Sequence, residues 1–319
     1  MRALVTGAGG FIGRILCRML KQEGWEVVAN DLRYDRSWSA NAKDWFIRSY
    51  DEYNLYYGNT YDVIFHLGAN SLLAPSVKDP LTYIENNVSR FNTMLQNIIK
   101  NKSAPAIIFA SSAATYGDPG IDIALREEHA GTPCNPYGWS KLMGEHVLEQ
   151  ACLAHGLKGY SMRFFNVAGG YEELGQDLDQ PHVLTKMSVA RIKGEKFRIN
   201  GANYDTYDGT CVRDYIHVTD VCDALIAAAK QITKDPETSY TEYNVCSQTK
   251  TSNLQLADRF QEMFGLFYEF IDVRPGDPGY LYGDNRNTIL ELGWTPRMDL
   301  HDIIESHYDY VSRKMLNEN

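Results

Sequence analysis

The sequence predicts an α/β fold in which a mostly parallel sheet is covered by helices on both faces and carries a smaller mixed lobe. Two observations predict the sheet. Short apolar runs alternate with helix-length segments through the first half of the chain, and a glycine-rich turn follows the first apolar run. Alternating strands and helices of this kind form the doubly wound Rossmann arrangement. A third observation, the loss of this rhythm after Asn166, predicts the smaller lobe.

Strands are expected where short apolar runs are bounded by polar or turn-forming residues. They are residues 2–6, 26–30, 45–48, 62–67, 106–110 and 159–164. Between these strands, apolar residues recur at helical spacing in three long segments. The segments are residues 11–23, 81–100 and 136–154.

The second half of the chain has a looser pattern. Polar stretches rich in Gly, Asp and Tyr at 172–181 and 201–210 are expected to be long loops, which in compact proteins often bind ligands. Helices and one strand are expected there in mixed order. They are helices 183–193, 219–230, 285–292 and 300–314, and a strand that ends at 215–218.

The composition excludes several classes of protein. Hydrophobic residues make up 44% and charged residues 23% of the chain, a balance typical of a globular protein rather than a disordered one. The formal net charge of -10 argues against a nucleic-acid surface, which needs clustered basic residues. Six scattered cysteines without a C-x-x-C pair indicate reduced thiols in the cytoplasm and no metal site. No apolar run approaches the ~18 residues of a membrane span, and no leader is recognised, so neither a membrane nor secretion is expected.

The first strand leads into a glycine-rich turn, in which Gly7, Gly10 and Gly13 follow G-x-x-G-x-x-G spacing. A diphosphate favours glycines there because it approaches the backbone at a helix N-terminus, where N–H groups and the helix dipole attract anions. The second strand ends in Asp31, whose carboxylate can accept both hydroxyls of an adenosine ribose and would repel a 2′-phosphate. These residues predict NAD rather than NADP. A flexible turn at the glycines and a capping role for Asp31 are the alternatives.

The dinucleotide motif sets the expected division of the chain. Residues 1–165 are expected to form a dinucleotide-binding domain, which the chain re-enters around 213–245. The rest of 166–319 is expected to be mainly a substrate-binding lobe.

Tyr137 and Lys141 lie four residues apart, directly after Pro136, which suits the first position of a helix. The two side chains therefore share one helical face. The pKa of a free tyrosine is ~10, and a neighbouring ammonium and the positive nicotinamide ring of bound NAD are both expected to lower it and make the phenol a usable base. Ser111 and Ser112 end a predicted strand, where hydroxyls can meet a ligand at the carboxyl edge of the sheet. Without the glycine turn, this spacing would equally fit ordinary surface residues.

These motifs, in this order, resemble the extended short-chain dehydrogenase/reductase family, and within it the branch of UDP-hexose 4-epimerases. The resemblance covers nearly the whole chain. It implies a homodimeric enzyme that uses NAD to invert C4 of a nucleoside-diphosphate sugar, such as UDP-glucose or UDP-galactose, through a 4-keto intermediate. The other matching stretches are NNV at 86–88, SSAATYG at 111–117, NPYGWSKLMGE at 135–145, RFFN at 163–166, DGTCVRDYIHV at 208–218, RPGD at 274–277 and LGW at 292–294.

The resemblance implies a role for each matching residue. Tyr137 is expected to be acid and base at the sugar 4-hydroxyl, with Ser112 as its hydrogen-bond partner and Lys141 on the nicotinamide ribose. The cofactor is expected to contact residues from several strand ends and from the catalytic helix. They are Gly7, Gly10, Phe11, Ile12, Asp31, Leu32, Leu67, Gly68, Ala69, Asn87, Ser111, Tyr137 and Lys141.

The substrate residues that the resemblance implies lie mostly in the second half. Asn166, Arg213 and Arg274 are expected at the substrate diphosphate, and Asp277 at the nucleoside ribose. Guanidinium groups suit phosphate oxygens and would supply the local cations that an acidic chain needs. Leu281 aligns with a residue that walls the sugar pocket, so plain UDP-hexoses are expected to be preferred over N-acetyl forms.

Two helical segments also suggest an assembly. Residues 81–100 and 136–154 carry more apolar positions than one buried face needs. In the resembled family the matching helices pair across a two-fold axis, so an isologous four-helix interface is expected.

The chain departs from the family pattern at four places. The region 31–62 is short, Ser71 stands where a Lys is common near the cofactor, and Phe164 replaces a Tyr. His182-Val183-Leu184 replaces an Asn-containing stretch near the base, which leaves the identity of the nucleoside open.

Three other functions were weighed against epimerisation. A 4,6-dehydratase or a decarboxylase would need acidic residues directly after Ser112, where this chain has Ala113 and Ala114. A sugar-nucleotide reductase or dehydrogenase keeps the same Tyr, Lys and Ser and stays open. A non-catalytic NAD-binding protein is the least favoured, because binding alone does not require an activated phenol.

Overall fold

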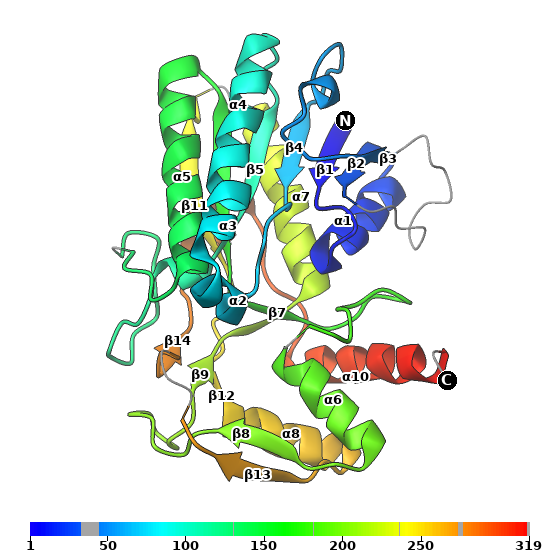
Figure 1. Ribbon diagram of the computed structural model, residues 1–319, viewed down its shortest axis with the longest axis vertical. Helices are drawn as coiled ribbons and strands as arrows, with labels where there is room; N and C mark the ends of the chain where they lie inside the picture. The colour runs from blue at the N-terminus through cyan, green and yellow to red at the C-terminus, as the bar shows by residue number, and fades with distance from the viewer. Residues whose placement is uncertain (33–44, 130, 181, 236, 274–276, 318–319) are drawn as a thin grey trace.

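The computed structural model describes residues 1–32, 45–129, 131–180, 182–235, 237–273 and 277–317. In this part of the chain, seven strands form a parallel sheet in the order β11-β6-β5-β4-β1-β2-β3 (Figure 1). The chain moves outward from β1 to β3, then returns beside β1 and continues from β4 to β11. This order confirms the doubly wound Rossmann fold. The reversal between β1 and β4 is the place where such sheets bind ligands.

The six strands predicted in the first half of the chain are all present, with their ends shifted by at most two residues, and the strand predicted to end at 215–218 is β10 (Tyr215–His217). Strand β11 (Tyr240–Val245) was not predicted, because its first half is polar and only partly buried. It pairs in parallel with β6 and forms one edge of the sheet. The predicted strands are β1 Arg2–Thr6, β2 Glu26–Asp31, β3 Trp45–Ile47, β4 Val63–His66, β5 Ala106–Ser112 and β6 Lys158–Phe164.

Helices cover both faces of the sheet, as Figure 1 shows. In β1, Ala3 and Val5 are buried in the core shared with α1 and α7, whereas Leu4 is buried in the core shared with α4 and α5. Because both faces are covered, the strand is apolar along its length instead of alternating with polar residues. The four covering helices are α1 Phe11–Gln22, α7 Val218–Lys234, α4 Arg90–Lys100 and α5 Pro136–His155.

The helix predicted at 81–100 is interrupted. The chain forms α3 (Pro80–Ile84), a π-helical turn at Glu85–Ser89 and then α4. Such turns are rare and frequent at functional sites. In this turn Asn87 is buried, and its amide binds two partners outside the helix, the backbone of Asn70 and the hydroxyl of Ser140.

The smaller lobe lies beyond the carboxyl ends of the sheet strands (Figure 1). Residues such as Met187, Phe260 and Ile304 form its own apolar core between three helices and the parallel pair β8–β13. The predicted helices α6 and α10 are present, whereas α8, β8 and β13 were not predicted. The elements are α6 Val183–Lys193, β8 Phe197–Asn200, α8 Asn253–Phe264, β13 Tyr268–Ile271 and α10 Leu300–Asn317.

Short elements lie between the sheet and the lobe. β7 pairs in parallel with β10, and β9 lies between β12 and β14. They are β7 Asn166–Ala168, β9 Val212–Arg213, β10 Tyr215–His217, β12 Thr251–Ser252, β14 Tyr280–Leu281, α2 Leu73–Lys78 and the predicted helix α9 Arg286–Leu292.

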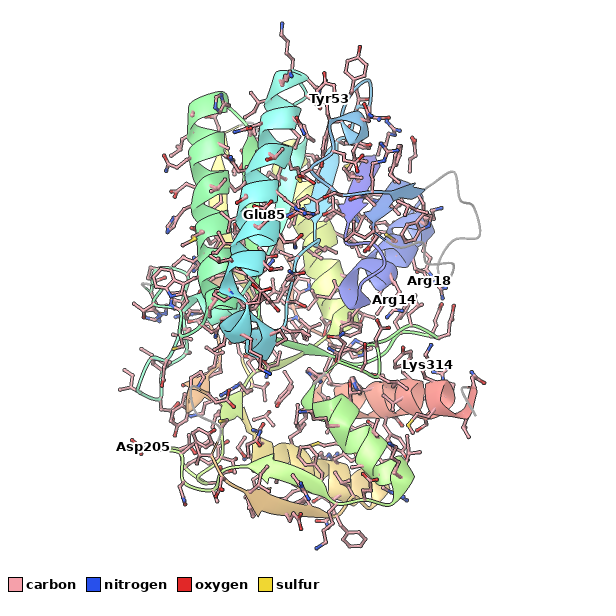
Figure 2. All side chains as sticks on the ribbon, in the orientation of Figure 1. Arg14, Arg18, Tyr53, Glu85, Asp205 and Lys314 are labelled. Atoms are coloured by element: carbon pink, nitrogen blue, oxygen red, sulfur yellow. The ribbon has the colours of Figure 1, made fainter. Side chains whose placement is uncertain are left out.

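Two arginines of α1 connect the sheet to the segment that follows β7. Arg14 and Arg18 project from the same side of α1 (Figure 2). The Arg14 guanidinium donates to the Gly175 carbonyl at 2.6 Å and to the Asp177 carboxylate at 2.9 Å. Arg18 forms an ion pair with Glu173 at 2.6 Å. In the described part of the chain, no helix is long and apolar enough to cross a membrane.

Candidate active site

The glycine turn lies against the end of β4, at the reversal of the strand order. Gly7 has a φ of +71°, and a Cβ on it would lie 2.7 Å from the backbone nitrogen of Gly68. Only glycine therefore allows this contact. Helix α1 begins after Gly10 without a capping side chain, which leaves the N–H groups of its first turn for an anion. Of the residues expected at the cofactor diphosphate, Phe11 and Ile12 form the partly buried start of this helix.

Asp31 ends β2 next to this turn. Its carboxylate accepts the backbone N–H of Gly9 at 3.0 Å and that of Leu32 at 2.7 Å, and it is partly buried. The side chain is therefore held at the sheet edge where an adenosine ribose would lie if a dinucleotide followed the glycine turn. Leu32, 65% exposed, follows it on the surface.

The segment after β4 completes the trough. Leu67, Gly68 and Ala69 are partly buried, and Thr6 holds the segment by accepting the N–H of Gly68 at 3.3 Å. The buried amide of Asn87 accepts the N–H of Asn70 at 2.8 Å and donates to its carbonyl at 2.9 Å. Three features together form a site that fits NAD: the glycine turn that packs closely on Gly68, the uncapped start of α1, and the Asp31 carboxylate placed for a ribose. Each direct contact with the cofactor stays a prediction.

The catalytic helix begins as its sequence predicts. Asn135 caps α5 by accepting the N–H of Gly138 at 2.9 Å, and Pro136 takes the first position. The next residue, Tyr137, thereby faces the end of β5, where it shares a hydrogen bond with Ser112. One turn later, the buried Lys141 ammonium donates to the Ala110 carbonyl at 2.8 Å. The structure thus brings together the three residues that were expected to act in catalysis.

On balance, the protein's own groups do not lower the Tyr137 pKa, and the expected effect of the nicotinamide ring stays a prediction. Burial raises the pKa of Tyr137 above its ordinary value, and the hydrogen bond with Ser112 lowers it by less. Lys141 is not among the groups that lower it, since its ammonium is directed at Ala110 and over the Phe109 ring. Burial also lowers the pKa of Lys141 to about 8, against the opposing charge of Glu145. Lys141 therefore stays mostly charged at neutral pH.

A cavity of about 900 Å³ lies between the carboxyl edge of the sheet and the smaller lobe. On the sheet side it begins at Ala114 and Asn135, two residues from Ser112 and Tyr137 respectively. Segments distant in sequence meet around it because α6, β8 and β9 all border this space. The predicted substrate residues that line it are Asn166, Arg213, Asp277 and Leu281, while Arg274 lies outside the described residues.

The cavity residues differ in what holds them. Arg213 donates to the Val212 carbonyl at 2.8 Å and to the Pro278 carbonyl at 2.9 Å, which fixes its guanidinium beside the residue that follows Asp277. Leu281 lines the cavity and also packs on the buried cluster that contains Tyr116 and Phe165. It is therefore both a wall of the cavity and part of a core.

The segment after Ser112 carries no group for elimination chemistry. Ala113 and Ala114 begin a short 3-10 turn (Ala113–Thr115), and Ala114 lines the cavity with a methyl group. A dehydratase would need an acid and a base at this place, which methyl groups cannot supply.

Sequence reasoning missed several residues of the site. Glu145 and Arg163 form a buried ion pair directly behind Ser111, and Lys186 lines the cavity from α6. Glu145 lies one further turn along the same helix face as Tyr137 and Lys141, so its spacing was the signal. Lys186 had no comparable signal, because only the tertiary fold brings α6 to the cavity. Among the described residues, no group of three or more His, Cys, Asp or Glu side chains could hold a metal ion.

The chain resembles known proteins along nearly its whole length. The model of the NAD dependent epimerase/dehydratase family matches residues 3–246. A UDP-glucose 4-epimerase of Lactobacillus helveticus is 32% identical over 327 aligned positions, which cover 97% of each chain. The crystal structure of UDP-glucose-4-epimerase from Stenotrophomonas maltophila, with bound NAD and formylated UDP-arabinopyranose, has a TM-score of 0.91 at 26% identity and covers 100% of both chains. That of UDP-glucose 4-epimerase from Bifidobacterium longum, in complex with NAD+ and UDP, has a TM-score of 0.89 at 27% identity and covers 99% of both.

Proposed function

Because the chain belongs to the NAD dependent epimerase/dehydratase family, we propose that it inverts C4 of a UDP-hexose and so interconverts UDP-glucose and UDP-galactose. The observation that carries this proposal is the catalytic set at the cavity. Tyr137, Ser112 and Lys141 lie together, and the next cavity residue is Ala114 rather than a second acid or base.

The protein supplies the proton chemistry of this reaction. Tyr137 removes and returns the proton of the sugar 4-hydroxyl at its phenolic oxygen, while the Ser112 hydroxyl holds that oxygen in place. The charged ammonium of Lys141 lies one helical turn after Tyr137 on α5. NAD, when bound, supplies hydride chemistry that no side chain can perform. The volume of the cavity leaves room for the sugar to present either face, which inversion at C4 requires.

The substrate is held by the cavity residues of the second half. We assign its diphosphate to Asn166, Arg213 and Arg274, and its nucleoside ribose to Asp277. Arg213 and Lys186 support this assignment, because they bring positive charge to the cavity of a chain whose net charge is -10. The solved relatives named above contain UDP or a UDP-sugar, which favours uridine as the nucleoside.

The cofactor preference follows from Asp31. Its carboxylate already accepts two backbone N–H groups at the end of β2, so its position is fixed there. A fixed negative charge accepts ribose hydroxyls and repels a 2′-phosphate. This favours NAD over NADP.

The assembly proposed is a two-fold homodimer. Large apolar side chains are exposed on α3 and α5, with Leu81 78%, Trp139 44%, Met143 40% and Leu153 65% exposed. On α5 the three apolar residues follow helical spacing and form one stripe on the face turned away from the sheet. Such a stripe is better explained by a second copy of this chain than by solvent.

Two coarser assignments complete the proposal. The division into a dinucleotide-binding domain at 1–165 and a lobe at 166–319 stays a prediction, as does the cytoplasmic location. All six cysteines are free thiols, and five of them are buried, which fits a reducing compartment.

Nuclear magnetic resonance of the reaction mixture tests the proposal. Purified protein loaded with NAD is incubated with UDP-glucose, UDP-galactose and their N-acetyl forms, with no further cofactor added. We expect interconversion of the first two until equilibrium, catalysed without net consumption of NAD. A reductase or dehydrogenase would instead stop after one turnover unless a stoichiometric nicotinamide cofactor is supplied.

A further inference from the structure

The catalytic helix is attached to β5 by three contacts in a row. Residues 137, 141 and 145 are spaced by four on one face of α5, and each binds β5. Tyr137 bonds Ser112, Lys141 donates to the Ala110 carbonyl at 2.8 Å, and Glu145 accepts the hydroxyl of Ser111. Because Lys141 and Glu145 are 4% and 1% exposed, both contacts are shielded from water. The third contact has no part in the proton chemistry.

Arg163 on β6 fixes Glu145 from the other side. Its guanidinium binds the carboxylate with two hydrogen bonds, Nε to Oε1 at 2.9 Å and Nη2 to Oε2 at 2.7 Å. Arg163 lies opposite Ser111 in the register of β5 and β6, so the pair locks α5 to both strands at one level. A carboxylate held by two parallel hydrogen bonds from one guanidinium is fixed in orientation as well as stabilised.

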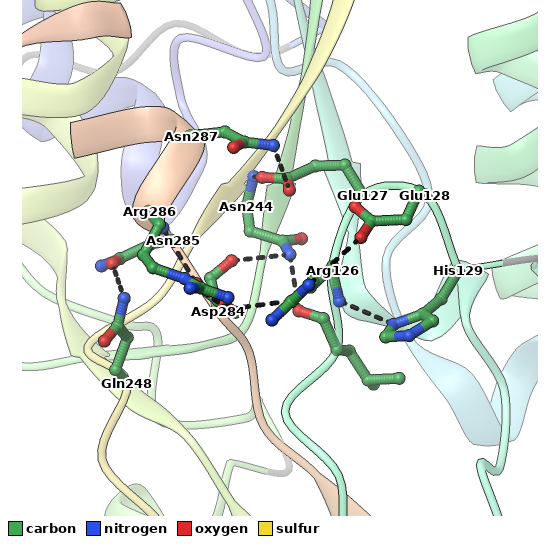
Figure 3. A network of polar contacts seen from close by, with 11 residues as sticks. Arg126, Glu127, Glu128, His129, Asn244, Gln248, Asp284, Asn285, Arg286 and Asn287 are labelled. Carbon is green, nitrogen blue, oxygen red and sulfur yellow. Dashed lines mark hydrogen bonds and ion pairs between the residues drawn. The ribbon is translucent and has the colours of Figure 1, made fainter. Parts of the chain in front are cut away.

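The other end of Arg163 reaches the wall of the cavity. Its Nη1 donates to the Tyr116 hydroxyl and to the Glu127 carbonyl, both at 3.0 Å. Tyr116 in turn donates to Asn244, whose N–H donates to the Glu127 carboxylate in the network drawn in Figure 3. Gly117, next to Tyr116, lines the cavity. One buried side chain therefore connects the catalytic helix with the cavity wall.

We propose that Glu145, clamped by Arg163, is a positioning residue that sets the register of α5 on β5 and so the place of Lys141 one turn from Tyr137. The proposal rests on the proposed epimerase function for its effect on turnover, but not for its effect on Lys141. Glu145 touches neither Tyr137 nor the cavity, so it acts through its neighbours. Its carboxylate is the group that opposes the loss of the Lys141 proton caused by burial.

Other ionisable groups face this cluster and have to be considered in any pH measurement. His66 of β4 faces Lys141, and burial lowers the pKa of His66 to about 3, so it stays neutral in the range of interest. Tyr240 and Glu242 of β11 face Glu145, with Glu242 4.0 Å from the Arg163 guanidinium. Burial raises the pKa of both, so the titration of Lys141 has to be followed by a signal of its own.

The test compares Glu145→Gln with Glu149→Gln, the same change one turn further along α5. Glu149 is partly exposed and lies 3.7 Å from the imidazole of His146, away from β5. For Glu145→Gln we expect kcat to fall roughly tenfold with KM changed less than threefold, and the alkaline limb of kcat to move about one pH unit lower. Glu149→Gln should leave both unchanged. An unaltered alkaline limb in Glu145→Gln would overturn the proposal, whatever happens to kcat.

Two further measurements keep the outcome decisive. If Glu145→Gln does not fold, the double variant Glu145→Gln/Arg163→Gln leaves no uncompensated buried charge but also no clamp, and the same fall in kcat with little change in KM is expected. In protein that contains carbon-13 labelled lysine, NMR follows the titration of Lys141 directly. The Lys141 signal is assigned as the one that is absent from the Lys141→Arg variant. A lowered Lys141 pKa in a protein without epimerase activity would refute the proposed function and leave the positioning role standing. An unchanged Lys141 pKa would refute the positioning role alone.

Discussion

The two sides of the cavity differ in the charge state of several buried ionisable groups. On the sheet side, Lys141, Glu145 and Arg163 are buried as charges, and each charge has a partner within hydrogen-bond distance. At the junction with the smaller lobe, three of the ionisable groups are histidines whose pKa is lowered by burial, which keeps them neutral. His182 and His217 have pKa values of about 4, and that of His307 is well below its ordinary value.

The difference reflects what each side has to do. Charges are costly to bury and are retained where they are paired and where proton transfer needs them. The junction needs only shape, and its histidines act as neutral hydrogen-bonding groups: Thr185 bonds His307 at 3.0 Å, and Ser306 bonds His217 at 2.9 Å. The sheet side is therefore expected to fail in function when altered, and the junction to fail in stability when protonated.

Tyr137→Phe should have the largest effect, because it removes the phenol that we propose as acid and base on the sheet side of the cavity. We expect kcat to fall by ~10²–10⁴ while NAD binding and folding change little. Tyr61→Phe is the matched control, since its buried hydroxyl donates to the Leu55 carbonyl at 3.0 Å and is not among the groups that shift the Tyr137 pKa. Steady-state kinetics and NAD fluorescence titration measure both variants. Retention of more than a third of wild-type kcat in Tyr137→Phe would remove Tyr137 from the mechanism.

Asp31→Ala should come next in size. Hydrogen bonds to a charged group contribute about 1.5–3 kcal/mol, so NAD affinity should fall roughly tenfold to a hundredfold, with NADP gaining relative to NAD. Asp62→Ala makes the same change at the opposite edge of the sheet, where Asp62 accepts the N–H of Arg2 at 2.7 Å. Calorimetry with both cofactors decides, and tighter binding of NADP than NAD by the wild type would contradict the role of Asp31.

The neutral histidines at the junction predict acid sensitivity. Their folded pKa lies below the unfolded value of ~6.5, so the stability they provide is complete above that pH and is lost as the pH falls towards 4. Each contributes a slope of about 1.4 kcal/mol per pH unit in that window. Asp214, whose pKa burial raises to about 7, acts in the opposite direction.

His217→Gln isolates one histidine from these opposing groups. The free energy of unfolding, measured with urea from pH 7 to pH 4, should depend on pH less steeply in this variant by about one proton. His155→Gln, an exposed histidine at the end of α5, serves as the control. Equal slopes in wild type and His217→Gln would show that His217 is not held neutral in the folded protein.

Leu281→Ser should have the smallest effect. If Leu281 excludes an N-acetyl group from the cavity, the variant should raise kcat/KM for UDP-N-acetylglucosamine relative to UDP-glucose by roughly tenfold, about 1.4 kcal/mol. Leu290→Ser is the control, because Leu290 is 80% exposed on α9. Since Leu281 also packs on a buried cluster, some loss of stability is expected without bearing on the ratio. An unchanged ratio would show that Leu281 does not select the sugar.

The sheet side could be predicted from sequence because its signals are contiguous. One turn carries the three glycines, and one helix carries Tyr137 and Lys141 behind Pro136. The partners of these residues on β5 were also recognised, since strand ends meet at one edge of a parallel sheet. The rise in the Tyr137 pKa that burial causes was not predicted, because burial is a tertiary property that spacing does not report.

The lobe was harder to predict because its site is assembled from distant segments. Arg213 and Leu281 meet only through the short pair β9–β14, and no local pattern marks two-residue strands. Helix α8 did have a local signal, the capping box of Ser252 and Gln255, which was overlooked. The π-helical turn at Glu85–Ser89 was missed because helical periodicity continues through it.

The central claim is that C4 is oxidised and reduced within one bound sugar. UDP-glucose carrying deuterium at C4 tests it, with the product analysed by proton NMR and mass spectrometry after incubation with NAD-loaded protein in ordinary water. We predict UDP-galactose that retains its deuterium at C4, since the hydrogen is removed from and returned to the same carbon without exchange. UDP-galactose with hydrogen at C4, or recovery of unchanged UDP-glucose alone, would contradict the account.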